Sequence, residues 1–182
     1  SSNGDILSFS VFVPPFESYI CTVQPGEAPP APKVINNTDP KISYIGEWTY
    51  NQKALASFNR DEHFSANKGD YAEFTFNGSG ISFLGTKTDN LGYADIFLDG
   101  KKICTVNGFA DQLNEPDIKT SAHSTKYLKD YLKYVIPEKQ VLFSISGLSK
   151  GSHTIKILVT GTKQSEASDC GVVIDAFELT TH

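Results

Sequence analysis

Short apolar segments with a period of two recur along most of the chain. In "YADIFLDG", Ala94, Ile96 and Leu98 occupy alternate positions, as expected for a strand with one buried face. Similar segments rich in Val, Ile, Phe, Tyr and Thr are separated by clusters of Gly, Asn, Asp and Ser, which is typical of strands joined by turns. Strands are predicted over 42–50, 71–76, 80–85, 93–98, 101–106, 140–146, 152–160 and 172–179. Many short strands at this spacing indicate an all-β sandwich or barrel.

Two of the predicted turns have the residues of tight hairpins. Asp99-Gly100 separates two apolar segments, and "NGSG" over 77–80 separates another two. These residues tolerate positive φ, and the resulting turns match the twist of antiparallel strands. We therefore expect antiparallel pairing across both turns.

One segment in the second half of the chain departs from the β pattern. Within 111–138, "STKYLKDYLKYVI" has Ser124 as a candidate N-cap and a stripe of Tyr127, Tyr131 and Tyr134 at helical spacing, which predicts one short helical insertion. The stripe either packs the helix on its own domain or contacts a sugar or protein.

The first part of the chain is predicted to lie outside the sandwich. Strand-like segments at 6–13 and near 18–23 are followed by the proline-rich "GEAPPAPKV", which is typical of an extended linker. We expect an N-terminal arm and linker over 1–40 and one sandwich domain over 41–182.

Composition and charge exclude several classes of protein. The formal net charge is −5, and no like-charge run reaches five residues, so the chain is not expected to bind nucleic acid. No apolar stretch is long enough to span a bilayer. The chain does not begin with Met, and we expect a removed export signal or tag before its first residue. Cys21, Cys104 and Cys170 form no metal-binding spacing, and both one disulfide and three thiols remain open.

Four segments, taken in chain order, carry a resemblance to a known family. They are "GDYAEFTFNGSGI", "ADIFLDG", the stretch from Gln140 to Ile157 that includes "GLSKGSHTI", and "VVIDAFEL". Together they resemble the galactose-binding-domain-like, carbohydrate-binding-module-like β-sandwiches appended to secreted bacterial glycoside hydrolases. The resemblance covers roughly 44–179 apart from the insertion. It implies a jelly-roll-like sandwich of two antiparallel sheets, and a secreted, cell-surface or periplasmic location that includes lipid anchoring through a removed N-terminal segment.

The resemblance also implies where ligands and a metal would lie. In some relatives a structural calcium is held by an early Glu-x-Glu strand and an Asp near the last strand. Asp175 matches that Asp, whereas the early Glu-x-Glu is missing here. We therefore expect no required cofactor, with a structural calcium at Asp175 as an additional expectation.

Sugar sites in the family lie in loops at one rim or on the concave face, and the loops corresponding to 86–93 and 162–171 lie near each other. The first loop contains Asp89, Asn90 and Tyr93, and the second contains Gln164 and Asp169. Amide and carboxylate groups can bind vicinal sugar hydroxyls. The alternative is that both loops are solvated turns.

Trp48 is the only tryptophan and is the candidate aromatic platform if its ring faces solvent. Tyr50 lies two positions away on the same predicted strand, so we expect the two side chains to be exposed together or buried together. The alternative is that Trp48 fills the core.

The sequence gives no strong indication of a catalytic site. It contains no H-E-x-x-H, and its G-x-S-x-G match, "GLSKG" over 147–151, lies inside a segment that carries the family resemblance. His63 and His153 are expected to be framework residues. The number of carboxylates leaves a glycosidase pair open. We expect non-catalytic binding of an oligo- or polysaccharide beside a catalytic domain or a neighbouring surface protein. The alternatives are a structural or protein-contact sandwich and, third, a glycoside hydrolase or esterase.

Overall fold

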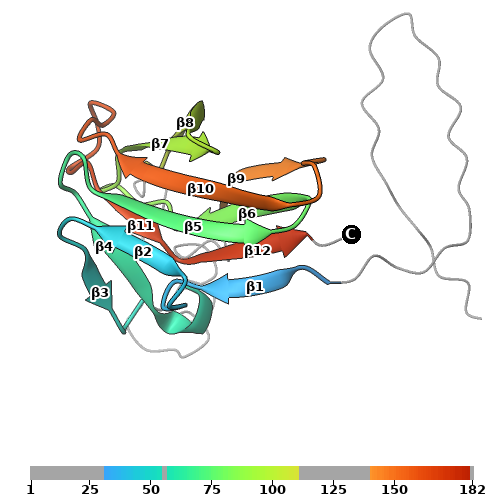
Figure 1. The fold of residues 1–182 in the computed structure, drawn as a ribbon. Helices are drawn as coiled ribbons and strands as arrows, with labels where there is room; N and C mark the ends of the chain where they lie inside the picture. Colours follow the sequence, from blue (N-terminus) through green and yellow to red (C-terminus); the bar gives the residue numbers. More distant parts are fainter. Residues whose placement is uncertain (1–30, 55–56, 111–139, 181–182) are drawn as a thin grey trace, which may run out of the picture. The chain divides into compact units, whose positions relative to one another are not determined.

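The computed structural model describes residues 31–54, 57–110 and 140–180 (Figure 1). The described residues form twelve strands and one 3-10 turn, η1, over Phe58–Arg60. The strands are β1 (Lys33–Asn36), β2 (Ile42–Ile45), β3 (Thr49–Asn51), β4 (Glu62–Ser65), β5 (Tyr71–Asn77), β6 (Gly80–Gly85), β7 (Tyr93–Leu98), β8 (Lys101–Asn107), β9 (Gln140–Ser146), β10 (Ser152–Val159), β11 (Val172–Ile174) and β12 (Ala176–Thr180).

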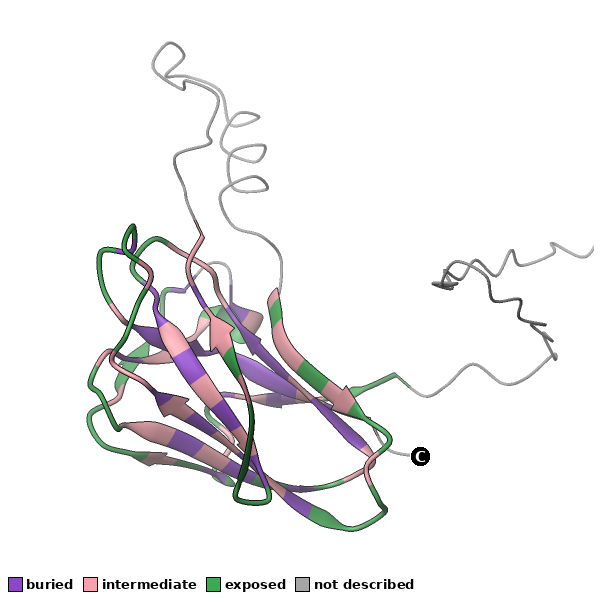
Figure 2. Ribbon diagram, turned by 90° about the horizontal axis from the view of Figure 1, so that it is seen from above, coloured by how far each residue is buried: buried purple, intermediate pink, exposed green. Residues whose placement is uncertain are grey.

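The strands form three antiparallel sheets. A five-stranded sheet has the order β2-β5-β10-β7-β8, and a four-stranded sheet has the order β1-β12-β6-β9. The five-stranded sheet packs on the four-stranded one, while a small third sheet of order β11-β4-β3 lies beside them (Figures 1 and 2). The predicted all-β antiparallel sandwich is therefore confirmed, with a third sheet that the sequence did not indicate.

The core lies between the two larger sheets because their strands alternate buried and more exposed residues (Figure 2). Phe177 on β12 is 1% exposed, and its ring centroid lies 5.4 Å from that of Phe74 and 5.9 Å from that of Phe83. The pattern of "YADIFLDG" is confirmed, since Ala94, Ile96 and Leu98 are all buried. These aromatic and aliphatic side chains join the layers across the sandwich.

Two predicted strands are divided in the structure. The segment 42–50 breaks into β2 and β3, because Gly46 adopts a φ of +102° and the Asp70 carboxylate accepts from the Glu47 N–H at 2.9 Å. The segment 172–179 breaks at Asp175, so that β11 pairs with β4 while β12 pairs with β1 and β6. At each division, the two halves of one predicted strand belong to different sheets.

Two strands were not predicted. β1 lies inside the 1–40 segment that we assigned to the arm and linker, and it forms an edge of the four-stranded sheet by pairing with β12. β4 is short and mixed in composition, so it lacks a clear period. The strands predicted at 6–13 and 18–23, the insertion helix with its tyrosine stripe, and Cys21 lie outside the described residues.

Two features bear on the chemistry of the described part. Cys104 and Cys170 are free thiols. Among the described residues, the structure contains no helix long and apolar enough to cross a membrane.

Candidate functional site

Loops 86–93 and 162–171 lie side by side and form what we call the rim. The Gly92 N–H donates to the Gly171 carbonyl at 2.8 Å, and the Tyr93 N–H donates to the Thr162 carbonyl at 3.0 Å. Further along, the Ser168 N–H donates to the Asp89 carbonyl at 2.7 Å. Backbone hydrogen bonds of this kind hold the loops in one relative position. The structure thus brings together two segments that are some 75 positions apart in the chain.

Glycines permit this close approach. A Cβ built on Gly92 would lie 2.5 Å from the Thr162 carbonyl oxygen, and one on Gly171 would lie 2.3 Å from the Phe64 ring. Both distances are too short for a real carbon contact. A side chain on Gly92 would therefore clash with the backbone of the other loop, while Gly171 leaves room for the Phe64 ring of β4.

The polar side chains of the rim are partly oriented by local hydrogen bonds. Asn90 Oδ1 accepts from Thr88 Oγ1 at 2.5 Å, and Asp169 Oδ1 accepts from the Cys170 N–H at 2.8 Å. Gln164 Oε1 accepts from Asn107 Nδ2 at 3.1 Å. Asp89, Asn90 and Asp169 are exposed, whereas Gln164 is half-buried. The rim thus presents carboxylate and amide groups from both loops to solvent.

Tyr93 stands at the exit of the first loop, where β7 begins. Its backbone carbonyl accepts from Thr160 Oγ1 at 2.8 Å, and its side chain is half-buried on the face of β7 opposite to Ala94. Tyr93 therefore borders the rim from the outer face of the five-stranded sheet.

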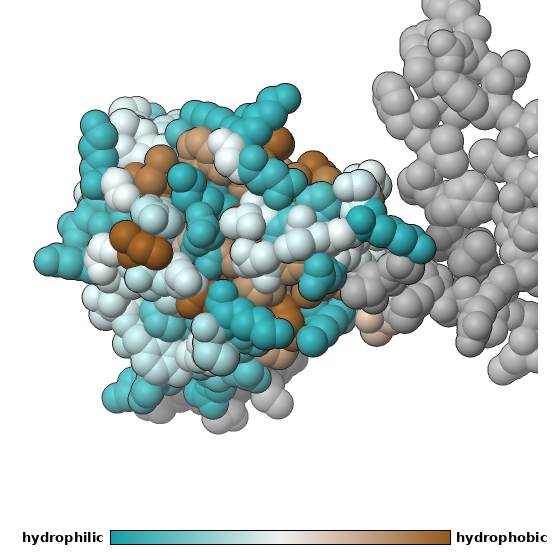
Figure 3. Space-filling view, viewed as in Figure 1, coloured by the Kyte–Doolittle hydropathy of each residue, from teal (hydrophilic) through white to brown (hydrophobic). Residues whose placement is uncertain are grey.

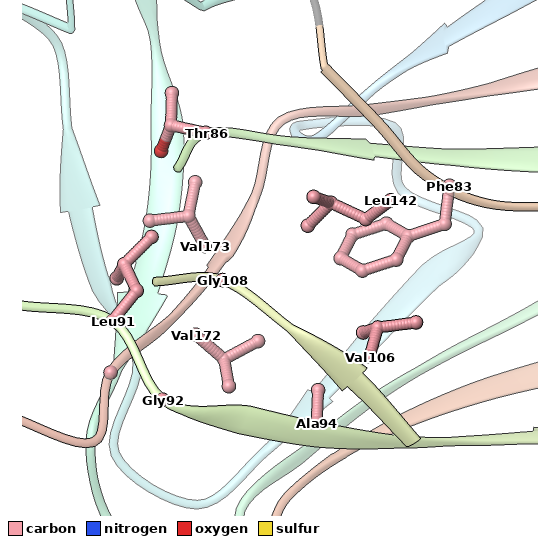
Figure 4. A pocket seen from close by; sticks show the side chains of 11 residues that line it. Phe83, Thr86, Leu91, Gly92, Ala94, Val106, Gly108, Leu142, Val172 and Val173 are labelled. Atoms are coloured by element: carbon pink, nitrogen blue, oxygen red, sulfur yellow. The ribbon is translucent and has the colours of Figure 1, made fainter. Parts of the chain in front are cut away.

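A hollow lies beneath the rim between the sheets (Figure 4). Its volume is about 220 Å³ including open solvent, and Thr86 is the one polar side chain among its lining residues. The others are Phe83, Leu91, Gly92, Ala94, Val106, Gly108, Leu142, Gly171, Val172 and Val173. An apolar lining offers few partners to sugar hydroxyls, so the polar groups that suit a sugar lie on the rim and not in the hollow.

Trp48 and Tyr50 do not share one environment, contrary to our expectation. Trp48 is half-buried, its Nε1–H donates to the Ile45 carbonyl at 3.2 Å, and its ring centroid lies 5.3 Å from that of Tyr44. Tyr50, by contrast, is 41% exposed. Trp48 precedes β3 and turns toward β2, whereas Tyr50 belongs to β3 itself, which explains the difference.

His63 lies at the centre of an aromatic stack that sequence reasoning missed. Its ring centroid is 4.1 Å from that of Tyr44 on one side and 5.0 Å from that of Tyr50 on the other. His63 Nδ1 lies 2.7 Å from Asn37 Oδ1. Burial lowers the pKa of His63, against the opposing effect of the Asp61 carboxylate. Burial also raises the pKa of Tyr44 far above its ordinary value. The stack connects β2, β3 and β4, which carry Tyr44, Tyr50 and His63.

Asp61 anchors the same stack through its carboxylate. Tyr50 Oη donates to Asp61 Oδ2 at 2.9 Å, and Asn37 Nδ2 donates to Asp61 Oδ1 at 2.6 Å. The only sequence signal for this network was the cluster "RDEH" just after an apolar segment, which has no diagnostic spacing.

Asp175 is buried, with 1% of its surface exposed, and its Oδ1 accepts from the Phe58 N–H at 2.7 Å. Because Asp175 lies between β11 and β12, this hydrogen bond connects the sandwich to η1. Within 31–54, 57–110 and 140–180, no group of three or more His, Cys, Asp or Glu side chains is arranged to hold a metal ion. A calcium at Asp175 stays a prediction.

Three carboxyl groups have pKa values below the ordinary range. A hydrogen bond from His153 lowers the pKa of Asp99, and one from Ser165 lowers that of Glu166. Partial burial acts to raise the pKa of Asp95, but hydrogen bonds from Lys102 and Thr105 outweigh it. A general acid of a glycosidase needs the opposite shift, so none of these three carboxyls suits that role.

Comparison with known proteins shows the fold. No protein-family model matches the chain. A relative, the A type blood alpha-D-galactosamine galactosaminidase of Flavonifractor plautii, is 23% identical over 124 residues, which cover 65% of this chain and 9% of the relative.

Solved structures cover more of the chain. A Paenibacillus xanthan lyase matches with a TM-score of 0.54 and 18% identity over 88% of this chain and 14% of the lyase. A family two carbohydrate esterase from Cellvibrio japonicus matches with a TM-score of 0.52 and 14% identity, over 84% of this chain and 34% of the esterase. The chain therefore spans well under half of each of these three proteins. These matches support the predicted antiparallel β-sandwich at the level of the fold.

Proposed function

We propose that this chain binds an oligo- or polysaccharide at the rim without catalysing a reaction. The observation that carries the proposal is the backbone pairing of the two loops, through which Asp89 and Asn90 share one surface with Asp169. Each sugar hydroxyl both donates and accepts, and side-chain amides and carboxylates can match both roles. A rim with few such groups, open to water, would bind one sugar unit with a dissociation constant of roughly micromolar to millimolar.

The names of the similar proteins support a place in glycan degradation. A galactosaminidase, a lyase named for xanthan and a carbohydrate esterase all carry a segment similar to this chain, which corresponds to a small part of each. We extend the proposal accordingly to a secreted, cell-surface or periplasmic chain that acts beside a catalytic domain or a neighbouring surface protein.

A structural or protein-contact role is the alternative. Ile103 and Val141 are 41% and 53% exposed on β8 and β9, which are edge strands of the two larger sheets. On the face shown in Figure 3, hydrophobic residues form small, separate patches among hydrophilic ones, which weighs against a large contact surface on that face.

Titration of the chain against a glycan panel by isothermal calorimetry tests the proposal. We expect saturable binding to at least one glycan, weakened about five- to tenfold by Asn90→Ala or Asp169→Ala, because each change removes a polar partner worth about 1–1.5 kcal/mol. Tyr93→Ala tests the bordering ring, with the melting temperature measured alongside.

Asn77→Ala is the matched control, since Asn77 is an exposed asparagine at the opposite end of β5. Binding should be unchanged in this variant. Lack of binding by the native chain to every glycan in the panel would overturn the proposal and favour the protein-contact role. Turnover of chromogenic glycosides or esters would overturn its non-catalytic part.

A further inference from the structure

Tyr50 presents an aromatic ring to solvent on an element separate from the rim. It lies on β3, whose three residues are all exposed, and 41% of its own surface is accessible. β3 is the last strand of the small sheet, next to β4 alone. Within the described residues, the backbone groups on its outer side therefore have no strand partner.

The ring of Tyr50 is held in one orientation. Its hydroxyl donates to Asp61 Oδ2 at 2.9 Å, while one ring face stacks on His63 at 5.0 Å with an interplanar angle of 29°. His63 stacks in turn on Tyr44 at 4.1 Å. A ring fixed in this way loses little conformational freedom when a ligand binds.

Two aromatic rings on the outer face of the five-stranded sheet, Tyr71 and Phe97, are covered by a lysine. On the outer face of the five-stranded sheet, Lys156 Nζ lies 5.2 Å from the ring centroid of Tyr71 and 4.6 Å from that of Phe97. This ammonium group occupies the space that a ligand would need over both rings. Tyr50, in contrast, contacts His63 on one side and is accessible on the other.

Polar groups border the exposed ring. The hydrogen bond that the Tyr50 hydroxyl donates to the Asp61 carboxylate at 2.9 Å raises the pKa of Tyr50, and the Gln52 side chain lies near enough to that hydroxyl to lower the pKa by a smaller effect. Trp48 lies two positions before Tyr50 and just outside β3, and its half-buried ring is turned toward Tyr44 on β2. An aromatic face, a side-chain amide and free edge-strand groups together match a sugar ring, which has both an apolar C–H face and hydroxyls.

We propose that the Tyr50 face, defined as Trp48, Tyr50, Gln52 and the outer edge of β3, is a second carbohydrate-binding site that takes a neutral oligosaccharide. One sugar ring stacks on Tyr50, and the next reaches toward Trp48. The carboxylate of Asp61, which accepts from the Tyr50 hydroxyl, lies beside the ring and repels an acidic sugar. The site goes beyond the rim and does not depend on it.

Trp48 fluorescence allows binding at the Tyr50 face to be measured separately from binding at the rim, because Trp48 is the only tryptophan of the chain. The rim-deficient variant is the full chain with both Asn90→Ala and Asp169→Ala. These two changes remove the proposed rim contacts and leave β3 intact. Mannopentaose, cellopentaose and xylopentaose serve as neutral probes, and trigalacturonate serves as the acidic probe. We expect a saturable change in Trp48 emission with at least one neutral probe in this rim-deficient variant, and an affinity at least tenfold lower for trigalacturonate.

Substitutions at Tyr50 then test whether the change in Trp48 emission comes from binding at the Tyr50 face. Added to the rim-deficient variant, Tyr50→Ala should lower the affinity for the neutral probe at least tenfold. Tyr50→Phe, which keeps the ring, should change that affinity less than threefold. Ile103→Ala is the control, because Ile103 is also 41% exposed but lies on β8. Thermal unfolding of each variant checks that the fold is retained.

Two results would overturn the second site. One is a Trp48 signal that stays flat with all three neutral probes, and the other is a saturable signal that survives Tyr50→Ala. Calorimetric binding by the native chain with a flat Trp48 signal would reject the Tyr50 face and leave the rim proposal standing. If Asn90→Ala and Asp169→Ala bind glycan as well as the native chain, and Tyr50→Ala abolishes the Trp48 signal, the rim proposal is rejected and the Tyr50 face is supported.

Discussion

His153 is held between two hydrogen-bond acceptors at the end of the sandwich opposite the rim. Its Nδ1 lies 2.7 Å from Asp99 Oδ2, and its Nε2 lies 2.9 Å from the Ser149 carbonyl oxygen. Two acceptors require both ring nitrogens to donate, which only the protonated imidazole can do. The Asp99 hydrogen bond and the Ser149 carbonyl accordingly raise the pKa of His153. The pair ties the β7–β8 turn to the loop before β10.

This pair predicts a pH dependence of stability. Because the pKa of His153 is raised in the folded state, its contribution is fully present below the unfolded pKa of about 6.5 and is lost as pH rises through the folded value. We expect His153→Gln to lower the free energy of unfolding more at pH 6 than at pH 9.5. Urea denaturation of both proteins at the two pH values measures this difference.

Comparing the variant with the native chain cancels the contribution of His63, whose pKa is lowered and whose effect has the opposite sign. A destabilisation that is equal at both pH values would show that His153 acts by packing alone.

At the scale of elements, the rim depends on the close approach of two loops that belong to different strand connections. The β6–β7 loop contains Gly92, and the β10–β11 loop contains Thr162 and Cys170. A Cβ on Gly92 would lie 2.5 Å from the Thr162 carbonyl oxygen and 2.7 Å from Cys170 Cα. Since both neighbours are backbone atoms, they cannot move aside as a side chain would.

Gly92→Ala should therefore separate the loops. We expect a loss of about 1–3 kcal/mol in the free energy of unfolding, as for other overpacked sites, together with loss of rim-dependent glycan binding. Thermal unfolding and calorimetry measure the two effects. Glu166→Ala on the same rim is the control for stability, because the Glu166 side chain is exposed and the hydrogen bonds given for it are to residues 164–166 of its own loop. Native-like stability in Gly92→Ala would contradict this account of the rim.

At the scale of the whole molecule, one apolar core joins the five-stranded and four-stranded sheets. Phe177 lies in that core from β12 and stacks within 6 Å of Phe74 and Phe83, one from each sheet. Both sheets therefore rely on the same side chain.

Phe177→Ala should lower the free energy of unfolding by about 3–5 kcal/mol, because it leaves a cavity between the sheets. Val141→Ala on β9, where 53% of the side chain is exposed, should change it by less than about 0.5 kcal/mol. Urea denaturation monitored by circular dichroism compares the two. Similar losses in both variants would contradict the placement of the core.

The sequence by itself determined the strands whose local pattern is complete. Period-two alternation located β5, β7 and β10 nearly to the residue, and the Asp99-Gly100 pair located a hairpin in which both residues adopt positive φ. These features depend on near neighbours in the chain, so a pattern read along the chain contains them. Polar loop residues such as Asp89 and Asn90 could likewise be named from sequence.

Only the tertiary structure decided which of these residues meet and which aromatic ring faces solvent. β1 and β4 are too short for a recognisable period and exist because β12 and β11 lie beside them. The environments of Trp48 and Tyr50 differ because Gly46 ends β2 and because His63, more than ten positions later, stacks beneath Tyr50. Contacts between distant segments set burial and exposure, and no local pattern records them.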